Sequence, residues 1–401
     1  MRRPRAVLLV ALLAGTLAVR PQLTAVGPLL PEIQDDFGID HATAGLLVTV
    51  PVLCMGLFAL PVARLLRRID VRTATGWCLA AIAVATVLRP LSPGFSMMVV
   101  STFVFGVGSG VVGALLPVVV KERFAERPAL GTGVFALGLN VGATLGAGLA
   151  VPLALATGGW RWSLGLLALA GALAVPAWVR LSRGSLGDAV PVETVDHLPW
   201  RSGFAWSATL LFGFQALCFF GLNAWLADAL IEAGWQEGRA GALVALLNVI
   251  AIPGVVLVSL LGGRVIGIRP YLAVAATGLV IGTVGLASTV GGGTAWGWVA
   301  VISLSLGSLF ALAMTLSAAT TDRPGEAAAL ASMQLGVGYT MAAAAPFALG
   351  ALRDATGSFA AGLWVVAGTA VLVAVFVATT IVLLGRRPAA PSATSRPRPG
   401  S

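Results

Sequence analysis

Charged residues are scarce in this chain of 401 residues: Asp, Glu, Lys and Arg make up 10% of it, whereas hydrophobic residues make up 58%. A soluble domain carries about 25% charged residues, which surround its core with a solvated surface. This chain cannot build such a surface, so we expect a lipid bilayer to cover most of it. The sequence also lacks a short period along its length, which excludes a repetitive fibrous protein.

Patterns of metal-ligating and catalytic residues are missing as well. Cys54, Cys78 and Cys218 lie in apolar runs without metal-like spacing, and both histidines, His41 and His197, lie in loop-like segments. No Ser-His-Asp, His-Glu or phosphate-loop motif occurs in the sequence either. We therefore expect no enzyme activity, no catalytic residue, no metal and no cofactor.

Lysine is nearly missing too. All basic residues except Lys121 are arginines, and the net charge is +9. A basic chain can bind nucleic acid, but these arginines lie mostly in short loops between apolar runs, which is the pattern of membrane topology. We therefore expect no nucleic-acid partner.

Long apolar runs are what the sequence has in abundance. A membrane-spanning helix needs about 20 apolar residues. The beginning of the chain resembles a signal peptide, but its apolar run continues past the possible cleavage site, so we interpret it as a retained helix. Twelve candidate spans follow one another at roughly 6–30, 42–63, 73–90, 95–120, 130–157, 161–181, 203–230, 239–263, 270–290, 294–318, 326–350 and 360–385.

Charge alternates between successive loops. Arginines precede the first span and occupy the middle loop and the loops after the second, fourth, eighth, tenth and twelfth spans. The positive-inside rule places these loops, and with them both termini, in the cytoplasm, so we expect a multi-pass protein of the cytoplasmic (inner) membrane. The opposite loops hold an acidic group and isolated arginines: Glu32, Asp35, Asp36, Asp40, Arg89, Arg161, Arg239 and Arg353.

The longest polar stretch between spans is SRGSLGDAVPVETVDHLPWRS at 182–202. It divides the chain into six spans and six spans. We expect two six-helix bundles, at 1–181 and 203–387, with a cytoplasmic linker at 182–202 between them. The tail at 388–401 is rich in Pro, Ser and Ala, which predicts disorder.

Twelve spans in two halves, with a long middle loop and a basic loop between the second and third spans, resemble the major facilitator superfamily. The run ARLLRRIDVR (63–72) resembles the cytoplasmic loop motif of that family, except that Arg67 stands where the motif has Asp, and Asp70 where it has Gly. The resemblance implies a gating role for the charged residues of this loop, which are Arg67, Arg68, Asp70 and Arg72.

Two glycine-rich runs extend the resemblance. FVFGVGSGVVG (103–113) is similar to the glycine repeat of the family's fourth helix, with Thr102 in place of the usual Arg, and GLNVGATLGAG (138–148) is similar to the motif of the fifth helix without its proline. Three further blocks are RPQLTAVGPLLPEI (20–33), FGFQALCFFGLNAWLADALIEAGW (212–235) and SMQLGVGYTMAAAAPFALGALRDATGS (332–358). They resemble signatures of the cyanate and nitroimidazole transporter branch, and this resemblance implies small, compact substrates that are often anionic or nitro-bearing.

Arg20 lies inside the first apolar run, where an arginine costs at least about 2.5 kcal/mol at a helix centre. Its side chain either snorkels to the outer headgroups or lies in a water-filled cavity, where it meets an anionic or electron-rich substrate. Thr16 and Thr24, four residues to either side, form a polar stripe with it, and intramembrane charges are usually functional, so we favour the cavity. Pro21 predicts a kink next to Arg20.

The seventh span carries a second polar stripe. Gln215, Phe219 and Asn223 recur every four residues, and Trp225 lies near the outer end. These side chains either line the cavity or serve as interhelical hydrogen bonds and an interfacial anchor. Together with Arg20 and Thr24, the candidate substrate-binding residues are Asn140, Gln215, Asn223, Trp225, Asn248, Gln334 and Tyr339.

No Asp or Glu lies deep inside an expected span, since Asp228 and Glu232 sit at the outer end of the seventh. A lone cation without a carboxylate favours an anion or a polarised neutral molecule as substrate. The sequence thus predicts an all-α membrane protein of twelve helices, a monomeric secondary transporter that moves a small molecule by alternating access. The alternatives are a multidrug or antibiotic exporter of the same superfamily and a non-transporting membrane receptor or assembly protein.

The topology can be tested by accessibility labelling in intact cells and in inside-out vesicles. A cysteine placed by Ser185→Cys should react only from the cytoplasmic side, and one placed by Asp36→Cys only from the outside. Reaction of both cysteines from the same face would contradict the twelve-span arrangement.

Overall fold

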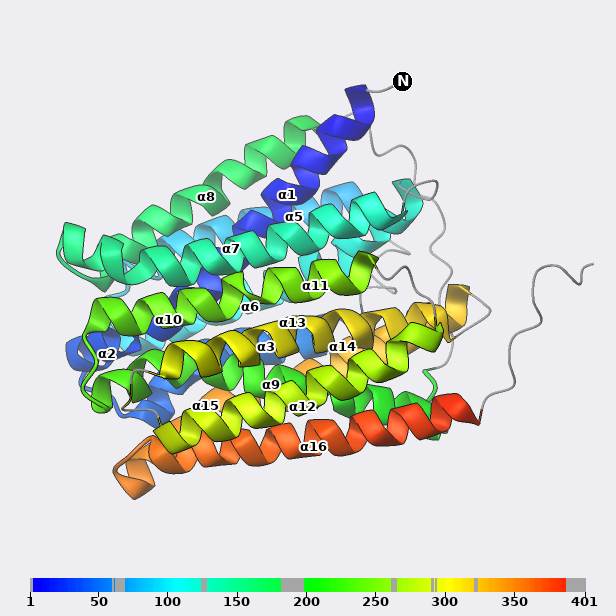
Figure 1. Ribbon diagram of the computed structural model, residues 1–401. Coiled ribbons are helices and arrows are strands. Elements are labelled where there is room, and N and C mark those ends of the chain that lie inside the picture. The colour runs from blue at the N-terminus through cyan, green and yellow to red at the C-terminus, as the bar shows by residue number, and fades with distance from the viewer. Residues whose placement is uncertain are drawn as a thin grey trace, which may run out of the picture.

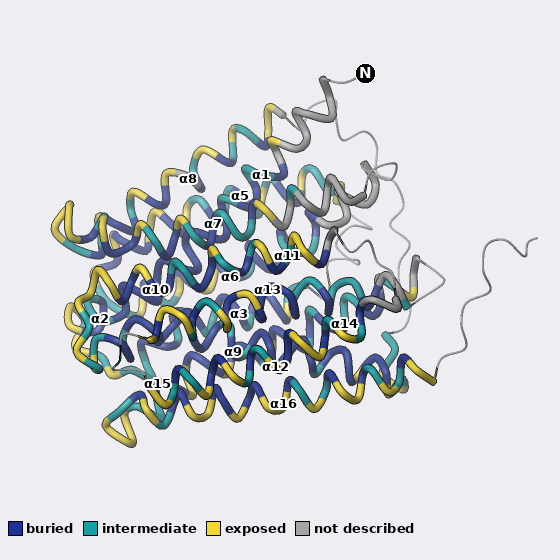
Figure 2. Tube along the Cα trace, viewed as in Figure 1, coloured by how far each residue is buried: buried dark blue, intermediate teal, exposed yellow. Residues whose placement is uncertain are grey.

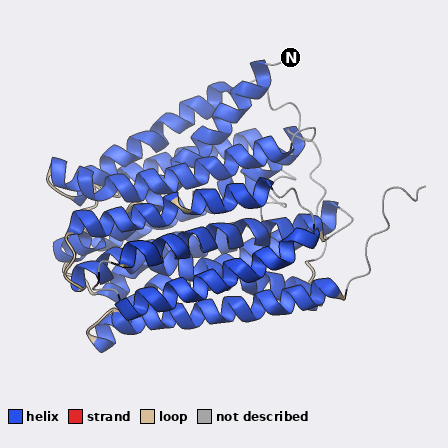
Figure 3. Cartoon of the chain, in the orientation of Figure 1, coloured by secondary structure: helices blue, strands red, loops and turns tan. Residues whose placement is uncertain are grey.

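The computed structural model is helical throughout the part of the chain that it describes (Figure 3). In lipid every backbone N–H and C=O must find a partner within its own segment, which an α-helix provides. The described residues are 3–59, 61, 69–123, 128–181, 198–260, 265–289, 292, 294–320 and 324–386. The helices are α1 (Arg3–Thr24), α2 (Val26–Phe37), α3 (His41–Ala59), α5 (Val71–Leu88), α6 (Phe95–Arg123), α7 (Pro128–Thr157), α8 (Trp160–Leu181), α9 (Gly203–Glu232), α10 (Glu237–Val249), α11 (Ala251–Leu260), α12 (Val265–Thr289), α13 (Ala295–Ala319), α14 (Pro324–Ala342), α15 (Ala344–Thr356) and α16 (Ala360–Gly385).

The described residues contain 11 segments long and apolar enough to cross a membrane, and these match the second to twelfth expected spans. Helices α1 and α2 together cover the first. The expected all-α architecture is therefore confirmed. Three of the spans consist of two consecutive helices, with α1 and α2 separated at Ala25, α10 and α11 at Ile250, and α14 and α15 at Ala343.

The helices lie side by side with their axes roughly parallel, and the beginning of α1 and the end of α16 lie at the same end of the bundle (Figure 1). We call this the terminal end. The opposite end, where α2 and α15 lie, we call the distal end. Helices α1–α8 form the N-terminal half and α9–α16 the C-terminal half, and the two meet where α7 packs against α10 and where α3 packs against α14 and α15.

Large apolar side chains cover the outside of the bundle. Trp77, Leu173 and Val274 are each about 70% exposed, at 73%, 69% and 71%. Exposed positions recur along the outward faces of the helices, whereas buried positions lie between them (Figure 2). An apolar outer surface of this kind fits a bilayer, because lipid tails replace water around it.

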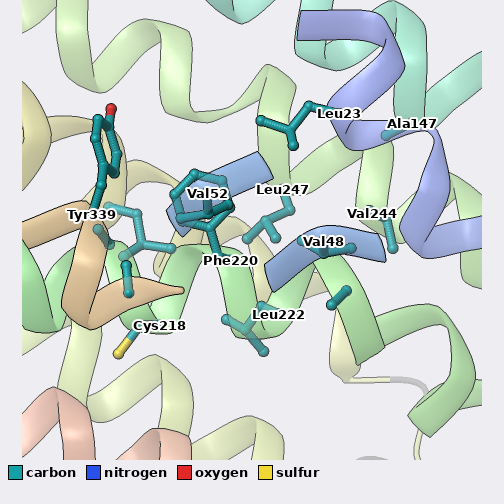
Figure 4. Close-up of a cluster of buried hydrophobic side chains, with 14 of the residues drawn as sticks. Leu23, Val48, Val52, Ala147, Cys218, Phe220, Leu222, Val244, Leu247 and Tyr339 are labelled. Atoms are coloured by element: carbon teal, nitrogen blue, oxygen red, sulfur yellow. The ribbon is translucent and has the colours of Figure 1, made fainter. Parts of the chain in front are cut away.

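The buried core continues from one half into the other. The cluster drawn in Figure 4 combines Leu23 of α1 and Val52 of α3 with Phe220 of α9 and Leu247 of α10. Apolar packing therefore joins the halves in this conformation as well as stabilising each of them.

Helix α1 packs closely on the glycine-rich face of α7. A Cβ atom at Gly142 would lie 2.9 Å from Cβ of Arg20, so a small residue is needed there. Oγ1 of Thr24 donates to the carbonyl oxygen of Ala143 at 2.8 Å, while Oγ1 of Thr16 bonds within its own helix. The polar stripe on α1 is therefore mostly a packing surface against α7, and Arg20 alone extends from it into a cavity.

The first span is interrupted at Ala25, between α1 and α2. Pro21 lies inside α1, and Arg20 remains helical. The break falls at Ala25, whose N–H still donates to the carbonyl of Pro21 at 2.9 Å. Helix α1 therefore continues past Pro21 and ends at Thr24, and the kink expected next to Arg20 stays a prediction.

At the distal end, Asp354 of α15 in the C-terminal half forms hydrogen bonds with the beginning of α3 in the N-terminal half. Its carboxylate accepts hydrogen bonds from the backbone N–H groups of His41 and Ala42, at 3.3 and 2.8 Å, and pairs with Nδ1 of His41 at 2.7 Å. Nearby, Nε1 of Trp225 donates to the carbonyl oxygen of Pro346 at 2.7 Å. Asp354 thus caps the beginning of α3 from the opposite half, where a carboxylate stabilises a helix N-terminus.

We predict that Asp354→Ala weakens this distal closure by about 1–2 kcal/mol, because it removes acceptors from two N–H groups and one imidazole. A cysteine placed by Ala44→Cys in buried α3 should then react faster with a thiol reagent. The matched control is Asp40→Ala, which removes a carboxylate that caps α3 from its own side of the interface through Thr43 N–H. Equal labelling rates in the two variants would contradict a role of Asp354 in joining the halves.

Candidate functional site

A cavity of about 60 Å³ lies between the two halves. Pockets that hold drug-sized ligands measure roughly 300–1,000 Å³, so this one suits a compact solute. Helices α1 and α7 contribute its wall on one side, and α9, α10, α11, α13 and α14 on the other. The residues that line it are Arg20, Leu139, Asn140, Ala143, Phe212, Gln215, Ala216, Phe219, Phe220, Asn248, Ala251, Val255, Leu306, Gly307, Phe310 and Tyr339.

Arg20 brings the positive charge of this cavity. Its side chain is 8% exposed, and its Nη1 is buried without a hydrogen-bond partner. The Tyr339 hydroxyl lies close enough to interact with the guanidinium. No acidic residue is among the described residues that line the cavity, so nothing in its wall neutralises Arg20. A buried donor without a partner is costly, and a solute that accepts a hydrogen bond removes that cost.

Gln215 adds an acceptor to the same cavity. Its Nε2 donates to the carbonyl oxygen of Leu306 at 3.2 Å, which fixes the side chain and leaves its buried Oε1 without a partner. The cavity therefore offers both a charged donor on Arg20 and a neutral acceptor on Gln215. A molecule that carries an acceptor and an N–H or O–H group matches both.

Aromatic rings form much of the remaining wall. Phe212 packs edge-on against Tyr339 with ring centroids 5.3 Å apart, and Phe220 contacts the same tyrosine at 6.0 Å. Phe310 lies 6.0 Å from Phe212. Such rings exclude water and offer flat apolar faces, which raises the strength of the few polar contacts inside.

The structure brings together five of the candidate binding residues expected from the sequence: Arg20, Asn140, Gln215, Asn248 and Tyr339 line the cavity. The Arg20 side chain lies in the cavity wall in this conformation, and it does not extend to the outer headgroups. Asn248 is held from behind, since its Nδ2 donates to Oδ1 of Asn223 at 2.9 Å and to the carbonyl oxygen of Val244 at 2.9 Å.

Asn223 and Trp225, two further candidates, are not among the residues that line this cavity. The amide of Asn223 is engaged with Asn248 and with the carbonyl of Phe219. The Trp225 indole donates to the carbonyl oxygen of Pro346 in α15, within the C-terminal half. Asn223 and Trp225 lie about two to three helical turns beyond Gln215 along α9, since one turn takes about 3.6 residues. Their contacts are therefore nearer to the distal end than the cavity is.

Thr24 and Gln334 also lie away from the cavity wall. Thr24 bonds to α7, and Nε2 of Gln334 donates to the carbonyl oxygens of Ala208 and Ala313, at 3.4 and 3.2 Å. These two side chains form interhelical hydrogen bonds, as polar residues in membrane spans often do. A one-dimensional sequence shows that a polar residue lies in a span but not which helix it faces.

Of the charged loop motif, Arg67 and Arg68 lie outside the described residues. Asp70 is the N-cap of α5, where its carboxylate accepts from Thr73 N–H at 2.9 Å, and this hydrogen bond lowers the pKa of Asp70. The carbonyl oxygen of Arg72 accepts from Nε1 of Trp178 in α8 at 3.2 Å. A helix-capping role is thus established for Asp70.

Sequence reasoning missed Arg89, which was expected in a loop at the outer surface. Its side chain is fully buried, with an exposed fraction of 0%, between helices of the N-terminal half. Arg161, expected in the next such loop, is partly exposed and pairs with Asp36 at 2.7 Å. Nothing in the local sequence separates these two arginines, because both follow the end of an apolar run.

Among the described residues, no group of three or more His, Cys, Asp or Glu side chains could hold a metal ion.

Comparisons with known proteins agree with this geometry. The chain is 31% identical over 93% of its length to the 2-nitroimidazole transporter of Escherichia coli (strain K12), of which it covers 94%. It is also 31% identical over 88% of its length to the cyanate transport protein CynX of the same organism, of which it covers 91%.

Solved structures share the fold at greater distance. A bacterial homologue of the human lysosomal transporter Spinster, in an inward-facing and unoccupied conformation, matches with a TM-score of 0.74 and 17% identity, over 96% of this chain and 98% of that one. The family model described as Major Facilitator Superfamily matches residues 12–343. Helices that pack around a small, mostly apolar cavity with one arginine, and a family match over most of the sequence, lead to one conclusion: this multi-pass membrane protein belongs to the Major Facilitator Superfamily.

Proposed function

We propose that this transporter moves a small anionic or polar solute, of the size and chemistry of cyanate or a nitroimidazole, through the cavity between its halves. One observation carries the proposal: a single small cavity contains a donor, Nη1 of Arg20, and an acceptor, Oε1 of Gln215, and neither atom has a hydrogen-bond partner. A cyanate ion or a nitro group accepts from the guanidinium. A ring N–H, or the proton of a neutral acid, donates to the amide oxygen.

The two Escherichia coli relatives support this choice, because their names give 2-nitroimidazole and cyanate as what they transport. Both solutes are compact and electron-rich. Export of bulky cationic drugs fits less well, because the cavity is small and its described lining carries an arginine and no carboxylate. A receptor that transports nothing would have no need for a cavity with a buried arginine between two halves that can rock against each other.

Transport by alternating access requires that the cavity open to each side in turn. In the conformation described above, Asp354 of α15 and Trp225 of α9 contact the beginning of α3 at the distal end, Asp354 through the N–H groups of His41 and Ala42 and Trp225 through the His41 ring. We propose that the distal end faces the outside and the terminal end the cytoplasm, in line with the arginine-rich loops. The cavity is built entirely within one chain, which supports a monomer as the working unit.

The energetics restrict how an anion can be imported. Moving one negative charge against a negative-inside potential costs about 2.3 kcal/mol per 100 mV. Arg20 cannot carry a proton in exchange, because an arginine stays charged at ordinary pH. We therefore propose that import uses the neutral, protonated form of an acid or an exchanged anion, whereas export of the free anion needs no coupling.

The proposal predicts that Arg20→Ala lowers the affinity for cyanate and for 2-nitroimidazole by at least about tenfold, since it removes a charge-assisted hydrogen bond. Arg20→Lys should restore little of it, because an ammonium does not reproduce the planar guanidinium. The measurement is counterflow of each labelled solute in proteoliposomes. The matched control is Arg239→Ala, which removes an exposed arginine away from the cavity. Unchanged counterflow in folded Arg20→Ala protein would refute this role.

A further inference from the structure

Arg89 is a buried cation that the transport site does not use. It forms the C-cap of α5, with its backbone N–H donating to the carbonyl of Ala85 at 3.1 Å. Its guanidinium lies over the ring of Phe105 in α6, 5.4 Å from the centroid. Its Nε and Nη2 are buried and have no hydrogen-bond partner, so no carboxylate of the described chain neutralises this charge.

The one hydrogen bond of this side chain leads to the substrate-facing helix. Nη1 of Arg89 donates to the backbone carbonyl of Gln22 at 3.0 Å. Gln22 belongs to the last four residues of α1, whose carbonyls have no N–H partner within their own helix. The carbonyl of Pro21 is satisfied by Ala25, and that of Gln22 by Arg89. Arg89 therefore satisfies a carbonyl that the break between α1 and α2 leaves open.

This location also explains how a buried arginine without an acidic partner is tolerated. The C-terminal ends of α1 and α5 both meet at Arg89, and each presents the negative end of a helix dipole. The face of Phe105 adds a cation–π contact. An apolar side chain of similar size would fill the same space without any charge to compensate, but it could not bind the Gln22 carbonyl.

Two more contacts fix the same turn of α1. Nε2 of Gln22 donates to the carbonyl oxygen of Leu164 in α8 at 3.0 Å, and Oγ1 of Thr24 donates to that of Ala143 in α7 at 2.8 Å. Arg20 lies two residues before Gln22 on this turn. If the carbonyl of Gln22 lost Arg89, the N–H of residue 26 would be its natural partner, which would extend α1 through the break and rotate the turn that carries Arg20.

We propose that Arg89 is a positioning residue, which keeps the break between α1 and α2 open and thereby aims Arg20 into the cavity. The inference rests on the proposed function only in taking Arg20 to be the group that meets substrate. The orientation of Arg20 can be measured without any substrate, so the two can fail separately.

The experiment places a reporter cysteine at the position of Arg20. In a background with Cys54, Cys78 and Cys218 replaced by Ala, Arg20→Cys is labelled with a small water-soluble thiol reagent in purified protein. Adding Arg89→Met should lower the labelling rate at position 20 by at least about tenfold, since a charged hydrogen bond that holds the turn is lost. Adding Arg89→Lys should restore part of the rate, because lysine keeps one charged donor.

Two controls separate positioning from general damage. A cysteine placed by Asn140→Cys on the α7 wall of the same cavity should be labelled at the same rate with and without Arg89→Met, whereas a loosened bundle would change both positions. Arg161→Met removes an arginine that binds the carbonyls of Pro90 and Ser92, in the turn after Arg89, and should leave position 20 unchanged.

The outcomes decide the proposal in each case. If Arg89→Met does not fold, the comparison of Arg89→Lys with the parent decides, and a labelling rate at position 20 clearly below that of the parent supports the proposal. An unchanged rate at position 20 in any folded Arg89 variant overturns it. So does an equal fall at positions 20 and 140, which would make Arg89 a residue of general stability. Failure of the wild-type protein to transport cyanate or 2-nitroimidazole would refute the proposed function and leave this result standing.

Discussion

A permanently charged guanidinium inside a lipid-covered bundle is the constraint on which the rest of this structure depends. A guanidinium carries its charge wherever it lies in a protein, so the surroundings of Arg20 must accommodate that charge. The close packing of α1 on Gly142 lets the side chain enter the cavity, where Tyr339 and the amide of Gln215 provide polar neighbours. One N–H remains without a partner, and that unsatisfied donor is what an electron-rich solute can bind.

The same constraint connects the cavity to the way the halves are joined. Helix α7 packs on α1 beside Arg20 and on α10 of the other half, so the wall that holds the charge is also part of the interface. Asn248 of α10 lines the cavity and bonds to Asn223 of α9. A solute that contacts both halves can therefore change how strongly they are held together, which is the requirement for a transporter that alternates between two conformations.

Much of the fold could be predicted from the sequence, because apolar runs of about 20 residues and arginine-rich loops reflect the bilayer directly. The place of Arg20 in a cavity followed from the cost of an intramembrane charge. The contact at the break was not predicted, since Arg89 reaches the Gln22 carbonyl from another helix and the sequence does not show which helices meet. Likewise, Trp225 and Gln215 lie in the same apolar run, and the sequence does not show that they face different neighbours. The packing of α9 places Trp225 against Pro346 near the distal end and Gln215 in the cavity wall.

The central claim is that the cavity selects a solute through a donor on Arg20 and an acceptor on Gln215. The most direct test compares 2-nitroimidazole, which carries an N–H group, with the cyanate ion, which carries none. Equilibrium binding to the purified protein gives the ratio of the affinities for 2-nitroimidazole and cyanate in wild type and in Gln215→Leu. The account predicts that this ratio falls at least about fivefold in the variant, because a neutral hydrogen bond of about 1 kcal/mol is lost for 2-nitroimidazole alone. A ratio that does not change, with both affinities measurable, would contradict the account.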